Sequence, residues 1–164
     1  MTHRPQQRKG TGFTIIEVMI VLAIAGLILV IVFLAVPSLQ RTSRNTQRKD
    51  DASAALAAVN EYATNNGGQL PKAAQPFNNP PSWIMGAAGS AQATARLGYY
   101  NTAAMVSLQT AYSAPAAQAT DTLTIYEGTQ CTSPTQSAAG TSRQIAAVFG
   151  VETSSGYSWQ CQES

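Results

Sequence analysis

Residues 9–37 read KGTGFTIIEVMIVLAIAGLILVIVFLAVP, and they contain an uninterrupted apolar run. The run covers residues 18–36, which are nineteen residues without a charged side chain. At about 1.5 Å of rise per residue it would form a helix of roughly 28 Å, close to the hydrocarbon thickness of about 30 Å of a bilayer. The run is therefore long enough to span a membrane.

A single carboxylate, that of Glu17, stands directly before this run. Ionisable side chains in membrane segments are expensive and are usually retained because they have a partner. A secretory signal peptide is the simplest alternative, with residues 33–36 as a weak cleavage region. Its apolar part is usually only about 7–15 residues long, however, and it has no use for such an acid. The length and Glu17 together favour a helix that remains in the mature protein.

The order of features in the first quarter of the chain resembles the class III signal of type IV pilins and pseudopilins. A basic leader is followed by Gly12, by Phe13 and, four residues later, by Glu17. The leader's basic residues are Arg4, Arg8 and Lys9. In that family a prepilin peptidase cuts after the glycine, and the new N-terminal residue is N-methylated. The resemblance thus implies cleavage between Gly12 and Phe13, N-methylation of Phe13, and a role for Glu17 in assembly.

The pattern departs from the family at one place. The family often has glycine at the position of Gly26, and this chain agrees. It commonly has proline at the position of Leu34, whereas here the proline comes three residues later, at Pro37. The departure leaves the site of a helix kink open but does not affect the processing.

The orientation of the chain in the membrane is inferred from the cysteines and not from the basic residues. Basic side chains lie on both sides of the apolar run, so counting them does not settle the orientation. Cys131 and Cys161 are the only cysteines and lie in polar, strand-like sequence, which predicts a disulfide in an exported domain. Two unpaired buried thiols are the alternative. We expect a single-pass inner-membrane protein with its N-terminus inside, and an extracellular location after assembly.

The composition fits a modest domain on a membrane stalk. The chain has 164 residues, 45% of them hydrophobic and only 11% charged, against about 25% in typical soluble proteins. Loss of residues 1–12 would leave seven basic side chains against eight acidic ones, a net charge of −1. This charge gives no support to nucleic acid as the main partner.

Residues 13–37 are expected to form the membrane and assembly helix, and residues 38–66 an amphipathic continuation. Apolar residues recur every three or four positions, which predicts one face packed on a domain. They are Leu56, Val59 and either Tyr62 or Ala63. Residues 65–68, Asn-Asn-Gly-Gly, predict the helix end. The charged residues 41–51 are interpreted as a solvated face, with contact to anionic headgroups and neighbouring subunits as the alternative.

The rest of the chain predicts a small sheet after a variable, loop-rich connector at residues 67–120. Four prolines in residues 69–82 predict a loop, and residues 103–112 are compatible with a short helix or a strand. In residues 121–164, alternating segments predict three or four antiparallel strands, each with one buried face. The segments are 122–126, 145–151 and 157–161, with a hairpin turn at 152–156 and Trp159 in the core. The predicted class is α+β, type IV pilin-like, with the sheet covering the helix.

Catalysis is not expected from this chain. The only histidine, His3, lies in the leader, and no metal-ligand spacing, phosphate-binding glycine loop or catalytic triad can be assembled. Four scattered acids are interpreted as surface residues and not as an acid/base pair. They are Glu61, Asp121, Glu127 and Glu152. The clustered aspartates that bind calcium in some major pseudopilins are missing, so no metal or cofactor is expected.

The resemblance implies a structural subunit that polymerises through its N-terminal helix into an extracellular filament for adhesion, motility or DNA uptake. Its partners would be copies of itself, the prepilin peptidase, the assembly platform, minor pilins and, before assembly, membrane lipid. The first alternative is a minor pilin or pseudopilin of a type II secretion or competence system. The second is a membrane-anchored binding module that does not polymerise.

Overall fold

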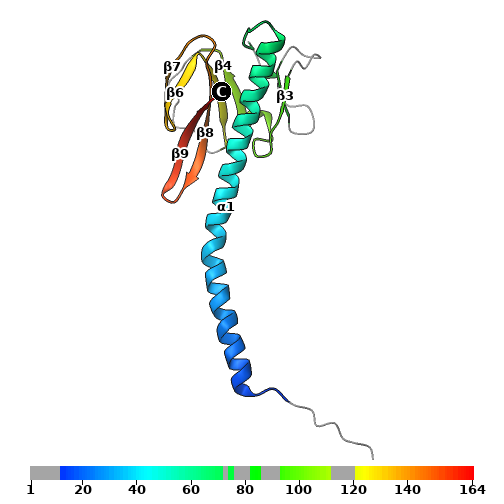
Figure 1. The fold of residues 1–164 in the computed structure, drawn as a ribbon, viewed down its shortest axis with the longest axis vertical. Helices are drawn as coiled ribbons and strands as arrows, with labels where there is room; N and C mark the ends of the chain where they lie inside the picture. The colour runs from blue at the N-terminus through cyan, green and yellow to red at the C-terminus, as the bar shows by residue number, and fades with distance from the viewer. Residues whose placement is uncertain (1–11, 72–73, 76–81, 86–92, 112–120) are drawn as a thin grey trace, which may run out of the picture. The chain divides into compact units, whose positions relative to one another are not determined.

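The computed structural model describes residues 12–71, 74–75, 82–85, 93–111 and 121–164 (Figure 1). The chain divides into two compact units, Met1–Gln40 and Arg41–Ser164, and we call the second unit the head. One long helix, α1 (Ile15–Asn65), contributes to both units. Residues 1–11 of the leader, including His3, lie outside the described residues.

The first unit consists of the N-terminal part of α1. Every described residue from 12 to 40 is exposed. Pro37 lies inside the helix, where it removes one backbone donor. The hydroxyl of the neighbouring Ser38 donates to the Ala35 carbonyl at 2.8 Å. The helix is long and apolar enough to cross a membrane, and none of the side chains in its apolar window is buried within the chain.

The C-terminal part of α1 buries one stripe in the head. Leu56 and Val59 are buried, and Tyr62 packs partly buried against the same cluster, which confirms the predicted apolar face. The helix ends at Asn65, as its Asn-Asn-Gly-Gly sequence predicts. Gly67 and Gly68 have φ of 65° and 85°, and the Gly68 N–H donates to the Ala63 carbonyl at 2.7 Å. This 6→1 bond is that of a Schellman motif, which requires the left-handed backbone that glycine readily adopts.

The main sheet has four strands in the order β4-β5-β8-β9. These strands are β4 (Val106–Gln109), β5 (Leu123–Glu127), β8 (Ile145–Thr153) and β9 (Gly156–Glu163). The pairs β5/β8 and β8/β9 are antiparallel, as predicted, but β4 pairs with β5 in parallel. The parallel strand, β4, lies in the segment predicted to be a connector, and no alternation of apolar and polar residues predicted a strand there.

The prediction that each strand buries only one face is wrong for the two central strands. Every residue of 123–126 and of 145–151 is buried. One face supplies Ile125 and Phe149 to the core that includes the helix stripe. On the other side, a hairpin formed by β6 (Thr129–Ser133) and β7 (Gln136–Ala139) contacts β8 and β9. Alternation within a strand does not reveal that a separate hairpin covers its other face.

The final strand, β9, is an edge strand and is less buried than predicted. Trp159 is only partly buried, so its predicted place in the core is wrong. Tyr157 is 73% exposed. The physical reason is that within this sheet β9 pairs only with β8. The predicted hairpin is confirmed, with Ser154 and Ser155 in a two-residue turn between the strands.

Short strands also occur in the predicted connector. The strands β1 (Ala74–Gln75), β2 (Ser82–Met85) and β3 (Ala93–Arg96) form a second, antiparallel sheet. The predicted loop over residues 69–82 is therefore wrong at 74–75 and at Ser82, which lie between and beside the prolines. The open choice at residues 103–112 resolves into both elements, a 3-10 turn (Ala103–Met105) followed by β4.

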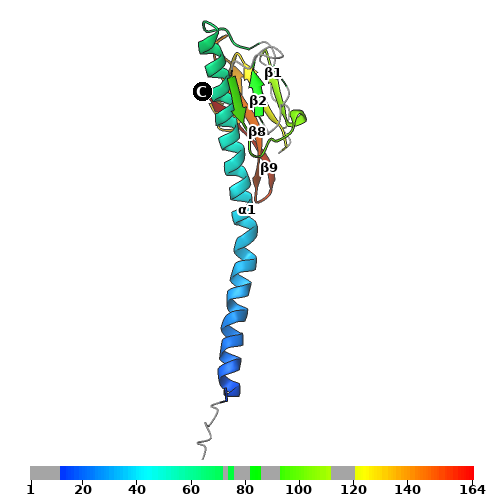
Figure 2. The same cartoon turned by 90° about the vertical axis from the view of Figure 1, so that its right-hand side faces the viewer.

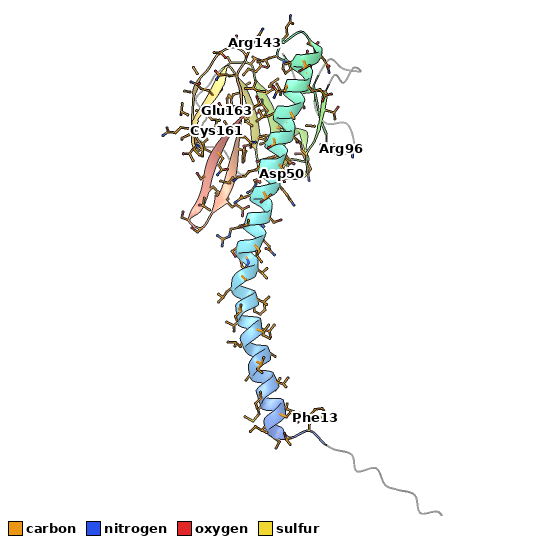
Figure 3. All side chains as sticks on the ribbon, viewed as in Figure 1. Phe13, Asp50, Arg96, Arg143, Cys161 and Glu163 are labelled. Atoms are coloured by element: carbon orange, nitrogen blue, oxygen red, sulfur yellow. A yellow bond between two sulfur atoms is a disulfide. The ribbon has the colours of Figure 1, made fainter. Side chains whose placement is uncertain are left out.

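The predicted disulfide joins Cys131 of β6 to Cys161 of β9, with a Cα–Cα distance of 5.7 Å. Two hydrogen bonds accompany it. The Cys161 N–H donates to the Pro134 carbonyl at 2.8 Å, and the Cys131 N–H donates to the Glu163 carboxylate at 3.1 Å (Figure 3). The bridge thus attaches the β6–β7 hairpin to the edge of the main sheet.

Replacement of both cysteines by serine should lower the free energy of unfolding of the head by about 3.5–4 kcal/mol, because the bridge closes a long loop in the unfolded chain. Chemical denaturation followed by tryptophan fluorescence measures this, and far-UV circular dichroism of the N-terminal helix in micelles should stay unchanged. Equal stability of the double variant and the oxidised protein would contradict the expectation.

Candidate functional site

The predicted processing and assembly residues lie together at the start of α1. Phe13 precedes the helix with its side chain 83% exposed (Figure 3), and Gly12 has open space around its Cα. Glu17 lies in the first helical turn and is also exposed. Cleavage at this place therefore meets no steric obstacle from the described residues.

A threonine missed in the sequence reading caps this helix. The hydroxyl of Thr14 accepts a hydrogen bond from the Glu17 N–H at 3.3 Å. Thr14 and Glu17 form the Thr-x-x-Glu pattern of a capping box, and this spacing was the signal for it. The acid also lies where the helix dipole favours negative charge.

The Glu17 carboxylate borders an apolar groove on the surface of the helix. Helical spacing of three and four residues brings the lining side chains into neighbouring rows. They are Phe13, Glu17, Val18, Val21 and Leu22. A surface that covers this groove would surround the carboxylate with hydrocarbon, which favours a cationic partner for Glu17.

The head holds a second polar cluster, which we call the arginine clamp. It consists of Arg44, Asn45 and Arg48 on α1, with Glu152 near the end of β8. Arg44 forms a bidentate ion pair with the Glu152 carboxylate, and Arg48 donates to the same carboxylate at 2.9 Å. The Asn45 amide donates to the Glu152 carbonyl at 2.8 Å and accepts from its N–H at 2.9 Å. Backbone and side chain of Glu152 are thus both fixed on the helix.

Arg48 is 1% exposed, and its charge is satisfied from several sides. Its guanidinium donates to the Tyr99 hydroxyl at 2.6 Å and lies 4.2 Å from the centre of the Tyr99 ring. The Tyr99 hydroxyl in turn donates to Asp121 at 2.9 Å. A cation over an aromatic face, with a carboxylate among its hydrogen-bond partners, is a stable arrangement for a buried arginine.

Asp51 fixes a loop from the next turn of the helix. It is 5% exposed and accepts three backbone hydrogen bonds. The donors are the N–H groups of Gly98 and Tyr99, each at 2.8 Å, and that of Tyr100 at 3.0 Å. The segment after β3 is thereby attached to α1, as the clamp attaches the β8–β9 hairpin.

Comparison with known families identifies the N-terminal segment. Residues 7–33 match the family described as the prokaryotic N-terminal methylation motif, and Gly12, Phe13 and Glu17 fall inside the match. This match supports the resemblance of the N-terminal segment to the signal of the type IV pilin and pseudopilin family. Members of this family are structural subunits that are processed by a peptidase and assembled by pilus machinery. No curated protein and no solved structure gave a match.

The clamp corrects the interpretation of the charged segment at residues 41–51. Residues 41–51 were expected to be solvated, but Arg48 and Asp51 are buried. Glu152 was expected to be a surface acid, but it is the clamp's carboxylate. The sequence contains a pattern that indicates this burial. Charged residues recur at the same spacings of three and four as the apolar stripe and lead into it: Arg41, Arg44, Arg48 and Asp51. This row of α1 faces the head whether its side chains are charged or apolar.

Two of the other acids that the sequence analysis places at the surface differ in how far they are exposed. Glu61 is exposed, as expected. Glu127 is partly buried, and this burial raises the pKa of its carboxyl. No group of three His, Cys, Asp or Glu residues that could hold a metal occurs among the described residues.

The clamp lowers the pKa of Glu152 to about 2. The hydrogen bonds from Arg44 contribute most, and Arg48 adds to the effect, while partial burial opposes it. The pKa of Arg44 is raised by the same hydrogen bond to Glu152. Because the pKa of Glu152 is lower in the folded state than in the unfolded chain, its stabilisation is complete above pH 4.5 and is lost as the pH falls toward 2.

We expect Glu152→Ala to lower the free energy of unfolding of the head by about 3 kcal/mol at neutral pH, because it leaves the buried Arg48 without its carboxylate. Between pH 4.5 and 2 the variant should lose less stability than the native protein. Urea denaturation across this pH range measures both effects.

The matched control is Glu61→Ala, which removes an exposed acid from the same protein and should change stability by about 0.5 kcal/mol or less. If Glu152→Ala and Glu61→Ala gave the same stability and the same acid dependence, the clamp would have no energetic role.

Proposed function

We propose that this chain is the structural subunit of an extracellular type IV pilus-like filament. The peptidase cuts between Gly12 and Phe13, Phe13 is N-methylated, and the mature chain polymerises through α1. The observation that carries the proposal is the exposed apolar surface of the first unit, with one acid at its start. Its large hydrophobic residues from Phe13 to Leu39 are between 39% and 83% exposed.

An apolar surface of this extent requires a cover outside the chain. Before assembly, lipid provides it, since the run of 18–36 matches the thickness of a bilayer. In a filament, the same surfaces of other subunits would replace the lipid. The disulfide of the head supports placing the head in an oxidising compartment, outside the cytoplasm.

Glu17 gives the assembly its axial register in this proposal. Cleavage creates a cationic amine on Phe13, one helical turn before Glu17. When helices bundle, the groove beside Glu17 is covered and both charges lose their water. Pairing of Glu17 of an incoming subunit with the Phe13 amine of a neighbour compensates both, and a buried charge left alone costs about 3–5 kcal/mol.

Glu17→Gln separates this role from helix capping. Glutamine can replace glutamate in a capping box but carries no charge. We expect Glu17→Gln and Glu17→Ala to be processed normally and to lose most surface filaments, as measured by shearing and immunoblotting.

The control variant is Thr14→Ala, which removes the cap at a cost of about 1 kcal/mol but keeps the carboxylate, and should still give filaments. Normal filament yield from Glu17→Gln would refute the pairing and leave capping as the role of Glu17.

A further inference from the structure

The turn between β8 and β9 carries an unusual exposed aromatic residue. Among the described residues of the head, Tyr157 is the one large hydrophobic side chain with high exposure, at 73%. It lies opposite Glu152 in the β8/β9 ladder and is separated from the turn of Ser154 and Ser155 by Gly156. The turn residues are exposed and uncharged.

This turn lies at the end of the head that contains Arg41, the first residue of the head. The Arg41 guanidinium donates to the Thr153 carbonyl at 3.5 Å, so the turn is adjacent to the first residue of the head. At the other end, Arg143 lies beside Gly68, just after the helix (Figure 3). Figures 1 and 2 show the turn and the C-terminal end of α1 at opposite ends of the head.

The chain length keeps this end of the head close to the lipid. Arg41 follows Val36, the last residue of the apolar run, by five residues. A helix of five residues rises about 7.5 Å, and the headgroup layer on each side of the hydrocarbon is about 5–8 Å thick. The side chain that contacts the turn therefore starts at the outer limit of the headgroup layer.

The charge and the side chains at this end suit that layer. Arg41 donates to the Thr153 carbonyl and Arg44 pairs with Glu152, so the groups beside the turn include two guanidinium groups and one carboxylate. Arg48 pairs with the same carboxylate but is buried. The positive excess attracts anionic headgroups. Tyrosine is enriched at membrane interfaces, because its ring is apolar and its hydroxyl stays hydrated.

We propose that the β8–β9 turn, with Tyr157 as its anchor, docks the head onto the lipid headgroup layer of the membrane before assembly. The contact rests on the proposed membrane insertion of residues 18–36. It holds the unassembled head against the bilayer and is released when the subunit leaves the membrane.

The test uses the full-length processed chain, labelled with 3-fluorotyrosine, at one copy per nanodisc of mixed zwitterionic and anionic lipid. Single copies exclude contacts with a neighbouring subunit. Tyr157→Phe and Tyr62→Phe assign two fluorine resonances, one at each end of the head. A lipid with a spin label on its headgroup should broaden the Tyr157 resonance several-fold more than the Tyr62 resonance.

The proposal would be overturned if the labelled lipid broadened both resonances equally while a soluble gadolinium chelate selectively broadened that of Tyr157. Tyr157 would then face water and not the headgroups. Hydrogen exchange of unlabelled protein gives a second readout, since lipid contact should slow exchange of residues 154–158 in native protein relative to Tyr157→Ser. Equal exchange in both would also contradict it. Failure of the chain to enter nanodiscs would instead refute the membrane insertion itself.

Discussion

The rest of the structure depends on one constraint, the apolar surface of the first half of α1, for which the chain provides no cover among its described residues. Folding of the head does not cover this surface, because the head buries a different part of α1, the stripe that includes Leu56 and Val59. The surface needs a bilayer or other copies of the helix. The match of residues 7–33 to the prokaryotic N-terminal methylation motif supports the proposed transfer of this surface from the bilayer to other copies of the helix.

The head is attached to α1 by two kinds of contact arranged along one row of the helix. Near its start, Arg48 and Asp51 bind Glu152 and the loop at 98–100 through charge and hydrogen bonds. Further on, Leu56 and Val59 pack against the sheet. The polar contacts fix the hairpin and loop in register, while apolar burial provides the larger part of the stabilisation. The N-terminal part of α1 therefore needs a cover from outside the chain, whereas one face of its C-terminal part is covered by the head.

The sequence predicted the features that depend on local pattern. The apolar stripe, the helix end at Asn-Asn-Gly-Gly, the β8–β9 hairpin and the disulfide all follow from spacing, glycines or cysteine count. The missed features depend on distant partners. Arg48 and Glu152 are 104 residues apart, and only the fold shows that they pair. The double burial of β8 likewise depends on the β6–β7 hairpin, and the parallel β4 on the strand beside it.

The central claim is that proteolysis creates the cation that Glu17 meets when the apolar helices bundle. Intact-mass measurement of natively purified protein tests it most directly. The account predicts a chain that begins at Phe13 and carries the added mass of one methyl group. A chain that retains Met1 or Thr2 at its start would contradict the account and indicate a plain membrane anchor.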